Sequence, residues 1–334
     1  MATNFTKGMK NPLLTLLFFL SVLTGFSQES TSSYNILKMA YSSHATALGG
    51  QNISVVDDMP SVGWQNPALL SGVSDKSLGL SFMTYAADSK LMGAQFVKAL
   101  GERHTIGFGA EYLGYGEMDE TDASGIVIGR FSPKDIVAGA GYSYLLSDRW
   151  AGGANLKLAY SKIADFSAVG LAVDVGLNYY DEEKDISFSA VLKNIGTEVK
   201  SFDETRQKLP FEAQLGLTFG FEHLPARVSV TFVDVTRWKD KYYYLDAEDE
   251  ELTFGRKALN HLVLGIDILP AESVYLSIGY NFRRGYELKA AGSSHAAGLT
   301  AGAGLRLKNF KLGAAYARYH YAYSSLLFDV AYSF

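Results

Sequence analysis

The histidines and serines of this chain are its candidates for catalysis or metal binding, and none of them lies in a recognised catalytic or metal-binding motif. The six histidines are scattered, and no H-E-x-x-H or comparable metal-ligand spacing occurs. No serine has the G-x-S-x-G context of a hydrolase, and no S-x-x-K occurs. We therefore predict that the protein is not an enzyme and has no catalytic residue, metal site or cofactor. An enzyme built on a barrel, with a Ser/His constellation at its rim, stays open as an alternative.

Two further patterns have structural interpretations. His261 and Asp267 fall on the same face of a predicted strand over residues 259–268, so they could form a buried polar pair, and a satisfied interior histidine is favoured over a general base. Glycine pairs at 107–109 and 139–141 lie inside predicted strands, whereas a dinucleotide site needs glycine at a strand-to-helix turn. We interpret these glycines as space on the inner face of a sheet.

The last ten residues alternate between two kinds of side chain. One face carries Leu326, Phe328, Val330, Tyr332 and Phe334, and the other carries Ser325, Asp329, Ala331 and Ser333. The same period of two recurs over 168–179, 211–219, 274–282 and 298–306, where the second face is small, polar or charged. This pattern is typical of a membrane barrel with lipid outside and a polar bore inside. An exported soluble β-sandwich is the competing interpretation, and it leaves the glycine-rich inner faces unexplained.

Bulk composition narrows the class of protein. Residues 1–27 have the three parts of a secretory signal peptide, with Lys7 and Lys10 before the apolar run 13–23 and small residues at the predicted cut. No later stretch approaches the roughly 20 apolar residues that a membrane-spanning helix needs. The chain has no cysteine, which excludes a disulfide framework and lipid attachment at a processed N-terminus. A net charge of -5 without a basic stripe argues against nucleic acid as a partner.

Counting the alternating segments predicts an all-β, transmembrane, antiparallel up-and-down barrel of about fourteen strands. The predicted strands cover 77–86, 90–100, 103–115, 136–145, 149–163, 166–180, 184–194, 210–220, 225–237, 259–268, 272–283, 296–307, 310–320 and 325–334. Short turns at 147–148 and 308–309 alternate with long connections at 195–209, 238–258 and 284–295. The segment from Thr121 to Phe131 also resembles a strand, but an additional strand would break the even count, so we treat 116–135 as an excursion outside the barrel.

The segment before the first predicted strand does not alternate. We divide the chain into a signal peptide (1–27), an N-terminal plug segment (28–75) and the barrel (76–334). A wall of about fourteen strands leaves a bore too wide for its own side chains to fill, so a plug is the economical prediction. Within this segment, Gly49 and Gly50 permit positive φ angles, and Pro67 forces the preceding residue out of the helical region.

The same segment carries a motif that resembles a known family. It reads Ala47-Leu48-Gly49-Gly50, then Asp57-Asp58, then Asn66-Pro67-Ala68-Leu69-Leu70. It resembles the start of the PorV/PorQ family of type IX secretion system proteins, which are FadL-like outer-membrane barrels, and the opening 34–39 looks closer to the PorQ branch. The resemblance is strong over this motif and covers the remainder only in general layout, including Lys157, Asp174 and 194–196.

The resemblance implies a fourteen-stranded barrel in the outer membrane of a Gram-negative bacterium. It also implies a non-enzymatic role in the type IX machinery, in which the protein anchors a PorZ-like surface partner through its outer loops and works beside the sortase-like PorU and the shuttle PorV. The alternative is a FadL-like transporter of a hydrophobic small molecule. An apolar ligand needs an apolar path, whereas the predicted inner face carries the polar residues Glu111, Asn155, Lys157, Asp174, Asn178, Glu212, Gln214, Arg306 and Asp329, which favours the scaffold.

Two groups of residues are the candidate sites. The plug motif consists of Gly49, Gly50, Asp57, Asp58, Asn66, Pro67 and Ala68, and we expect the two aspartates to cap turns or to pair with Lys157, Lys193 or Arg306 inside the barrel. A turn-rich linker with ordinary Asx turns is the simpler interpretation. The second group lies in the loop 238–258 and combines the aromatic and acidic residues Tyr242, Tyr243, Tyr244, Glu248, Asp249, Glu250 and Glu251 as a candidate partner-binding surface. A solvated loop is the alternative for such a charge run.

Overall fold

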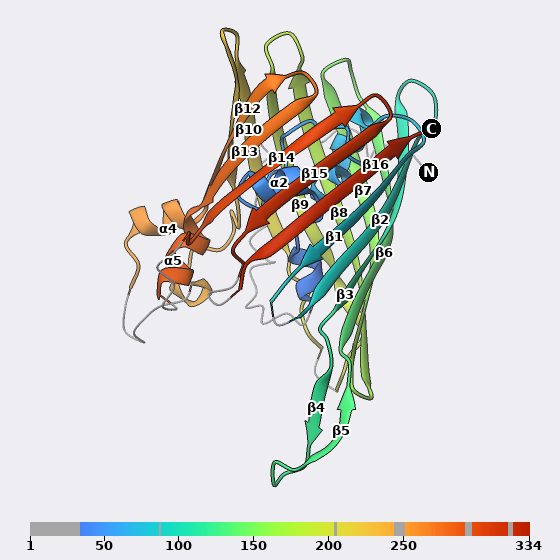
Figure 1. Ribbon diagram of the computed structural model, residues 1–334, viewed down its shortest axis with the longest axis vertical. Coiled ribbons are helices and arrows are strands. Elements are labelled where there is room, and N and C mark those ends of the chain that lie inside the picture. The colour runs from blue at the N-terminus through green and yellow to red at the C-terminus, as the bar shows by residue number, and fades with distance from the viewer. Residues whose placement is uncertain (1–33, 87, 204–205, 244–250, 291–295, 320–322) are drawn as a thin grey trace, which may run out of the picture.

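A closed antiparallel β-barrel forms the body of the protein (Figure 1). This computed structural model describes residues 34–86, 88–203, 206–243, 251–290, 296–319 and 323–334, so the predicted signal peptide lies outside the described residues. The wall strands are β1 (Ser77–Thr84), β2 (Lys90–Ala99), β3 (His104–Gly114), β6 (Lys134–Leu145), β7 (Trp150–Ile163), β8 (Phe166–Asp181), β9 (Ile186–Lys200), β10 (Glu212–Phe221), β11 (Leu224–Phe232), β12 (Leu262–Ala271), β13 (Val274–Asn281), β14 (Leu299–Leu307), β15 (Phe310–Ala317) and β16 (Ser325–Ser333). The prediction of a fourteen-stranded barrel is confirmed.

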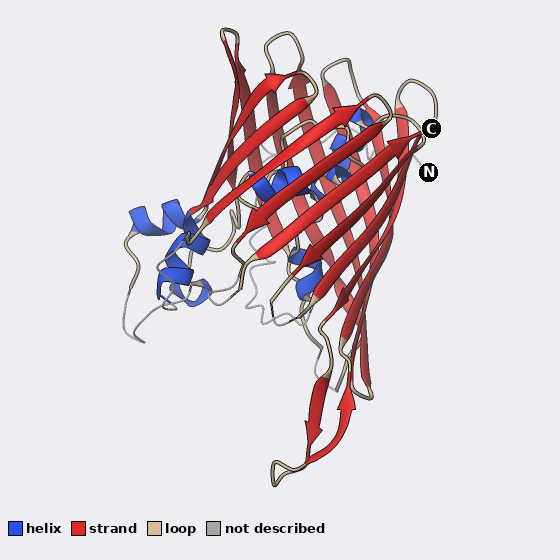
Figure 2. Cartoon of the chain, viewed as in Figure 1, coloured by secondary structure: helices blue, strands red, loops and turns tan. Residues whose placement is uncertain are grey.

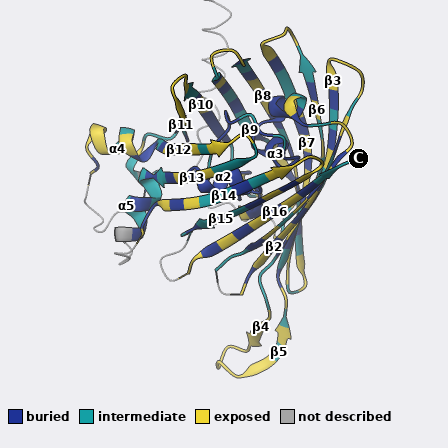
Figure 3. Ribbon diagram, turned by 45° about the horizontal axis from the view of Figure 1, so that its top comes forward, coloured by how far each residue is buried: buried dark blue, intermediate teal, exposed yellow. Residues whose placement is uncertain are grey.

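The first and last strands close the cylinder. β1 pairs with β16 from Ser77 opposite Ser333 to Met83 opposite Leu327, so the alternating C-terminal segment is a wall strand. Leu326, Phe328 and Val330 face outward, with Phe328 48% exposed, while Asp329 on the opposite face is 2% exposed. The same banding of exposed and buried residues runs along the other strands (Figure 3). These apolar faces do not meet across two stacked layers, so the β-sandwich interpretation is wrong.

The two rims of the barrel differ. Short turns, including 147–148 and 308–309, lie on one rim, and the longer connections lie on the other. At the long-loop rim, β4 (Met118–Thr121) and β5 (Val127–Phe131) form a separate two-stranded sheet that projects beyond the wall, which confirms the excursion predicted at 116–135. The prediction of a loop from residue 195 is wrong, because β9 continues to Lys200.

Helical turns supply the remaining regular structure (Figure 2). The long-loop rim carries η4 (Asp240–Tyr242), α4 (Phe254–Asn260) and α5 (Phe282–Ala290). The segment before β1 forms η2 (Asn35–Lys38), α2 (Ser43–Ala47), α3 (Val62–Gln65) and η3 (Pro67–Gly72). None of the helices in the described part of the chain is long and apolar enough to cross a bilayer.

The N-terminal segment, which we define as residues 34–75, lies inside the bore. α2 packs against β13 to β16, and η3 packs against β3, β6, β7 and β8. Local sequence explains its short turns, because the Ser42 side chain accepts a hydrogen bond from Ala45 N at 3.3 Å to begin α2. Asn66 caps η3 in the same way, and Pro67 occupies its first position, where a missing N–H costs nothing.

Glycine on the inner face lets this segment approach the wall. A Cβ on Gly109 or Gly139 would come within 2.7 or 2.8 Å of the Trp64 ring, and one on Gly302 would come within 2.6 Å of Ala47 Cβ. Such distances are shorter than any real contact, so larger residues at these positions would displace the segment. The interpretation of the glycine pairs as space is therefore confirmed, and Trp64 and Leu70 of the N-terminal segment fill that space.

Candidate functional site

His44 on α2 links the N-terminal segment to the wall. Its Nδ1 lies 2.9 Å from Asp57 Oδ2, its Nε2 lies 3.1 Å from both carboxylate oxygens of Asp267 on β12, and its ring stacks on Tyr275 at 3.9 Å. Burial alone would lower the pKa of His44, but the carboxylates of Asp267 and Asp57 outweigh it and raise the pKa to about 10. His44 is therefore an imidazolium at neutral pH and donates to a carboxylate on either side.

Hydrogen bonds on both sides of His44 hold the rest of α2. Ser43 N donates to Asp329 Oδ2 on β16 at 2.6 Å. After the helix, Gly49 N donates to the Thr300 hydroxyl at 2.9 Å, and that hydroxyl donates to Ala47 O at 2.6 Å. Gly49 and Gly50 have φ angles of 99° and 87°, as predicted, and a Cβ on Gly49 would lie 2.2 Å from Val263 Cγ1 of β12.

The two motif aspartates are bound to basic groups, as expected. Asp57 lies 3.4 Å from Arg306 on β14, and Asp58 lies 2.7 Å from Lys311 on β15. Burial raises the pKa of Asp57, but His44 and Arg306 outweigh it and hold the pKa below its usual value. The expected partner Lys157 instead pairs with Asp174 on β8, at side-chain exposures of 3% and 0%. The alternation of side chains along β15 indicates that Lys311 faces the bore, but Lys311 was not among the partners expected from the sequence for the two aspartates.

The Asn66-Pro67-Ala68 part of the motif anchors the other end of the segment. Asn66 is fully buried, its Nδ2 donates to Ile53 O at 3.0 Å and to the Ser189 hydroxyl at 3.1 Å, and its Oδ1 accepts from Ala68 N at 3.0 Å. Its backbone is extended, as the following proline requires. These hydrogen bonds span both the segment and β9, whereas Asx turns in a linker would be local.

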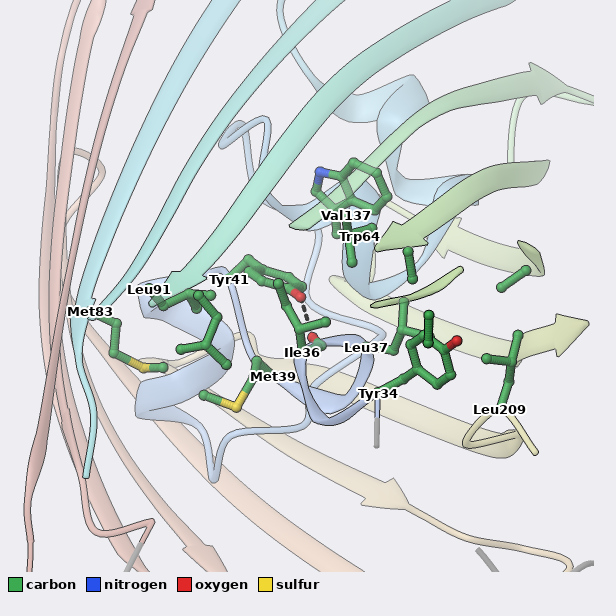
Figure 4. Packing of buried hydrophobic residues seen from close by; sticks show 14 of the residues in the cluster. Tyr34, Ile36, Leu37, Met39, Tyr41, Trp64, Met83, Leu91, Val137 and Leu209 are labelled. Carbon is green, nitrogen blue, oxygen red and sulfur yellow. Dashed lines mark hydrogen bonds between the residues drawn. The ribbon is translucent and has the colours of Figure 1, made fainter. Parts of the chain in front are cut away.

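Near the long-loop rim, the bore is filled by a cluster of apolar side chains, which we call the apolar chamber (Figure 4). Residues of the N-terminal segment, Tyr34, Ile36, Leu37, Met39 and Tyr41, insert among wall residues that include Met83, Leu91, Leu113, Val137 and Leu327. The Tyr41 hydroxyl donates to Ile36 O, which folds the segment back on itself. Below this level the inner face is polar and buried as predicted, with Glu111, Asn155, Lys157 and Asp174 all at most 3% exposed. Sequence reasoning missed the apolar ring at the outer strand ends.

Cavities lie at both ends of the bore. One of about 410 Å³ opens beside Lys38 and Arg284 at the long-loop rim. Two others, of about 350 and 390 Å³, share Asp57 and Arg306 near the short-turn rim. The N-terminal segment contributes residues to all three cavities. Within the described residues, no group of three or more histidine, cysteine or acidic side chains is arranged to hold a metal ion.

The candidate partner-binding loop is described only in part. Tyr242 is half-buried and Glu251 is exposed, while Tyr244, Glu248, Asp249 and Glu250 lie outside the described residues. The structure buries Tyr243, whose hydroxyl lies 2.8 Å from His261 Nε2, so this residue is not part of an exposed tyrosine cluster. The predicted pair of His261 with Asp267 is also wrong. His261 precedes β12 and also contacts Val233 O, whereas Asp267 binds His44.

Comparison with solved structures identifies the fold. The toluene transporter TodX of Pseudomonas putida has a TM-score of 0.54 and 16% identity over 88% of this chain and 98% of that chain. The monoaromatic hydrocarbon channel CymD has a TM-score of 0.52 and 12% identity over 90% and 99%, and a FadL homologue of Pseudomonas aeruginosa has 0.50 and 10% over 87% and 97%. No protein-family model and no curated protein matches the chain. The fold is therefore that of FadL-like outer-membrane channels.

Proposed function

We propose that this protein lies in the outer membrane of a Gram-negative bacterium and passes a hydrophobic small molecule through its bore. The long-loop rim faces outward from the cell and the short-turn rim faces the periplasm. The outward apolar faces of the strands meet the outer-membrane lipid. The fold shared with TodX and CymD supports this role.

The apolar chamber carries the proposal. The polar inner face, by itself, favours a sealed barrel, but the outer strand ends form a ring of Met83, Leu91, Leu113, Val137 and Leu327 that the protein fills with its own η2 side chains. An apolar ligand in place of the Ile36 and Leu37 side chains would contact the same apolar residues. Such surroundings suit a ligand, since binding pockets for small molecules are mostly apolar with few polar groups. Withdrawal of η2 would vacate this chamber and open it from outside.

Uptake measurements test the role directly. We expect cells that display the protein to accumulate toluene faster than cells with an empty vector. The double variant Ile36→Ala and Leu37→Ala, which shortens the side chains filling the chamber, should raise the rate further. Leu80→Ala is the matched control, because Leu80 is an outward-facing leucine on β1 that is 54% exposed. Uptake equal to that of the empty vector in both the parent and the double variant would refute the transporter role.

A second candidate function is the anchoring role in the type IX attachment complex, with PorZ, PorU and PorV as partners. The observation that favours it is the β4–β5 sheet, which projects beyond the wall and exposes Ile126, Val127 and Ile128 at 64%, 53% and 63%. Exposed apolar side chains of this kind are typical of contact surfaces. The segment 242–251, with its aromatic and acidic residues, is the other proposed contact.

Crosslinking in native membranes tests this second role. A tagged copy should recover a surface sortase assembly, and deletion of 116–131 or of 242–251 should reduce that recovery. Recovery of the full complex from both deletion variants, at equal amounts of folded barrel, would remove both loops as docking sites. Recovery of a small apolar molecule without any protein would leave the transporter role as the better explanation.

A further inference from the structure

The cavity at the long-loop rim is lined by more basic than acidic groups. Its basic residues are Lys38, Arg237, Arg283 and Arg284, and its acidic residues are Glu212, Asp234 and Glu287. Asp234 lies 3.2 Å from Arg237 and 2.6 Å from Arg283, and Glu287 lies 2.8 Å from Arg283. Two of the three carboxylates are therefore committed to these two arginines.

Arg284 and Lys38 have no carboxylate partner within the described part of the chain. The Arg284 guanidinium carbon lies over the Tyr319 ring, 4.2 Å from its centroid, in a cation–π contact. Both Arg284 Nη1 and the Tyr319 hydroxyl are buried without a hydrogen-bond partner among the described residues. A buried unsatisfied donor costs about 1–3 kcal/mol, and more when it is charged, so two such donors beside one cavity indicate a missing acceptor.

Gly50 keeps side-chain atoms away from these donors. A Cβ at this position would lie 3.0 and 3.1 Å from the two Nη atoms of Arg284 and 3.3 Å from the Tyr319 hydroxyl oxygen. A side chain at position 50 would therefore crowd all three polar atoms, and glycine leaves them free of side-chain cover. A guanidinium whose two Nη atoms lie on one side can bind a carboxylate or phosphate through two parallel hydrogen bonds.

The surroundings of this point favour an anion with an organic body. Loss of water around Lys38, together with the neighbouring cations Arg237 and Arg283, lowers the pKa of Lys38, and a bound anion would relieve that repulsion. The remaining wall includes the apolar side chains of Met39 and Leu288. The volume of about 410 Å³ exceeds what a single inorganic ion needs.

We propose that this cavity binds the oxyanion group, carboxylate or phosphate, of a small organic acid. Arg284 is the bidentate donor, Tyr319 donates its hydroxyl, and Lys38 is the second cation. Gly50 contributes by its lack of a side chain, which would crowd the Arg284 and Tyr319 donors. The site stands independently of whether the bore conducts, since it lies at the rim and needs no movement of η2.

Calorimetric titration of the full-length barrel in detergent tests the site. The probes are benzoate, phenyl phosphate and inorganic phosphate, and benzyl alcohol serves as the uncharged analogue of benzoate. We expect saturable binding of at least one oxyanion probe and at least tenfold weaker binding of benzyl alcohol, since tenfold corresponds to about 1.4 kcal/mol. Binding of inorganic phosphate alone would overturn the organic acid as the ligand and leave a free ion in its place, whereas binding of the aromatic acids supports the organic acid.

Variants separate this site from general effects on the barrel. Arg284→Gln should weaken binding at least about tenfold, and Tyr319→Phe, which removes only a hydroxyl, about threefold to tenfold. Arg256→Gln is the matched control, because Arg256 lies on α4 and does not line the cavity. Heat-modifiable gel migration checks folding in each case. No binding of any oxyanion probe up to about 10 mM, or unchanged affinity in both Arg284→Gln and Tyr319→Phe, would overturn the proposal.

Discussion

Replacing His44 by alanine should loosen the N-terminal segment from the wall. The imidazolium lies between Asp57 of the segment and Asp267 of β12, whose side chains are 7% and 1% exposed. Without it, both carboxylates stay buried and lose their shared counter-charge. Arg306 still lies 3.4 Å from Asp57, and the Ser277 hydroxyl still donates to Asp267, so the loss is partial.

The magnitude follows from the cost of an unpaired buried charge. Removing one partner of a buried ion pair destabilises a protein by about 3–5 kcal/mol. Because Arg306 and Ser277 remain, we take the lower end, about 3 kcal/mol, which corresponds to roughly a hundredfold shift toward the undocked segment. The wall hydrogen bonds are untouched by this substitution, so the barrel itself should stay closed.

A single cysteine can report the undocking, because the chain has no cysteine of its own. Ser43→Cys places a nearly isosteric thiol next to His44, at a position only 1% exposed. At pH 7 the thiol should react with a maleimide roughly a hundredfold faster in the His44→Ala background than in the parent. Heat-modifiable migration and urea unfolding of the wall serve to show that the barrel is intact.

His104→Ala is the matched control, since His104 is an exposed histidine on β3 that contacts only wall residues. Its effect on the labelling rate should be negligible. Equal labelling rates in the His44→Ala and parent backgrounds would show that the two carboxylates do not need the imidazolium. An equal acceleration by His104→Ala would show that the assay reports on the barrel and not on the contact of His44 with Asp57 and Asp267.

Three further predictions concern the same interior. The folded-state pKa of His44, about 10, lies above its unfolded value near 6.5, so its contribution is complete below about pH 6.5 and is lost as the pH rises through about 10; labelling of the cysteine reporter, corrected for thiolate content, should therefore increase over that range. Gly109→Ala should destabilise docking by about 1–3 kcal/mol, because its Cβ would lie 2.7 Å from a tryptophan ring, whereas Gly152→Ala, with its nearest atom at 3.6 Å, should be near neutral in the same assay. Lys157→Met should lower the urea midpoint by the equivalent of about 3–5 kcal/mol, and adding Asp174→Leu should recover much of that loss; a double variant as unstable as the single one would contradict this account.

Much of the fold follows from local alternation. Neighbouring residues of a strand point to opposite faces, so Leu326 and Phe328 had to share one solvent and Asp329 another, whatever the strand was paired with. The same argument placed Lys157 and Asp174 inside and predicted all the wall strands. Glycine within such faces also indicated that something approaches closely, as Gly109 does with Trp64.

Only the tertiary structure decided which interior groups meet. His44 and Asp267 are 223 residues apart, and Asp58 and Lys311 are 253 apart, so their pairing depends on strand register and on the path of the N-terminal segment. The burial of Tyr243 against His261 depends on how a long connection folds back over the rim. Facing direction is a property of each strand alone and can be obtained from its period of two, whereas contact requires the positions of two segments in space, which no local pattern contains.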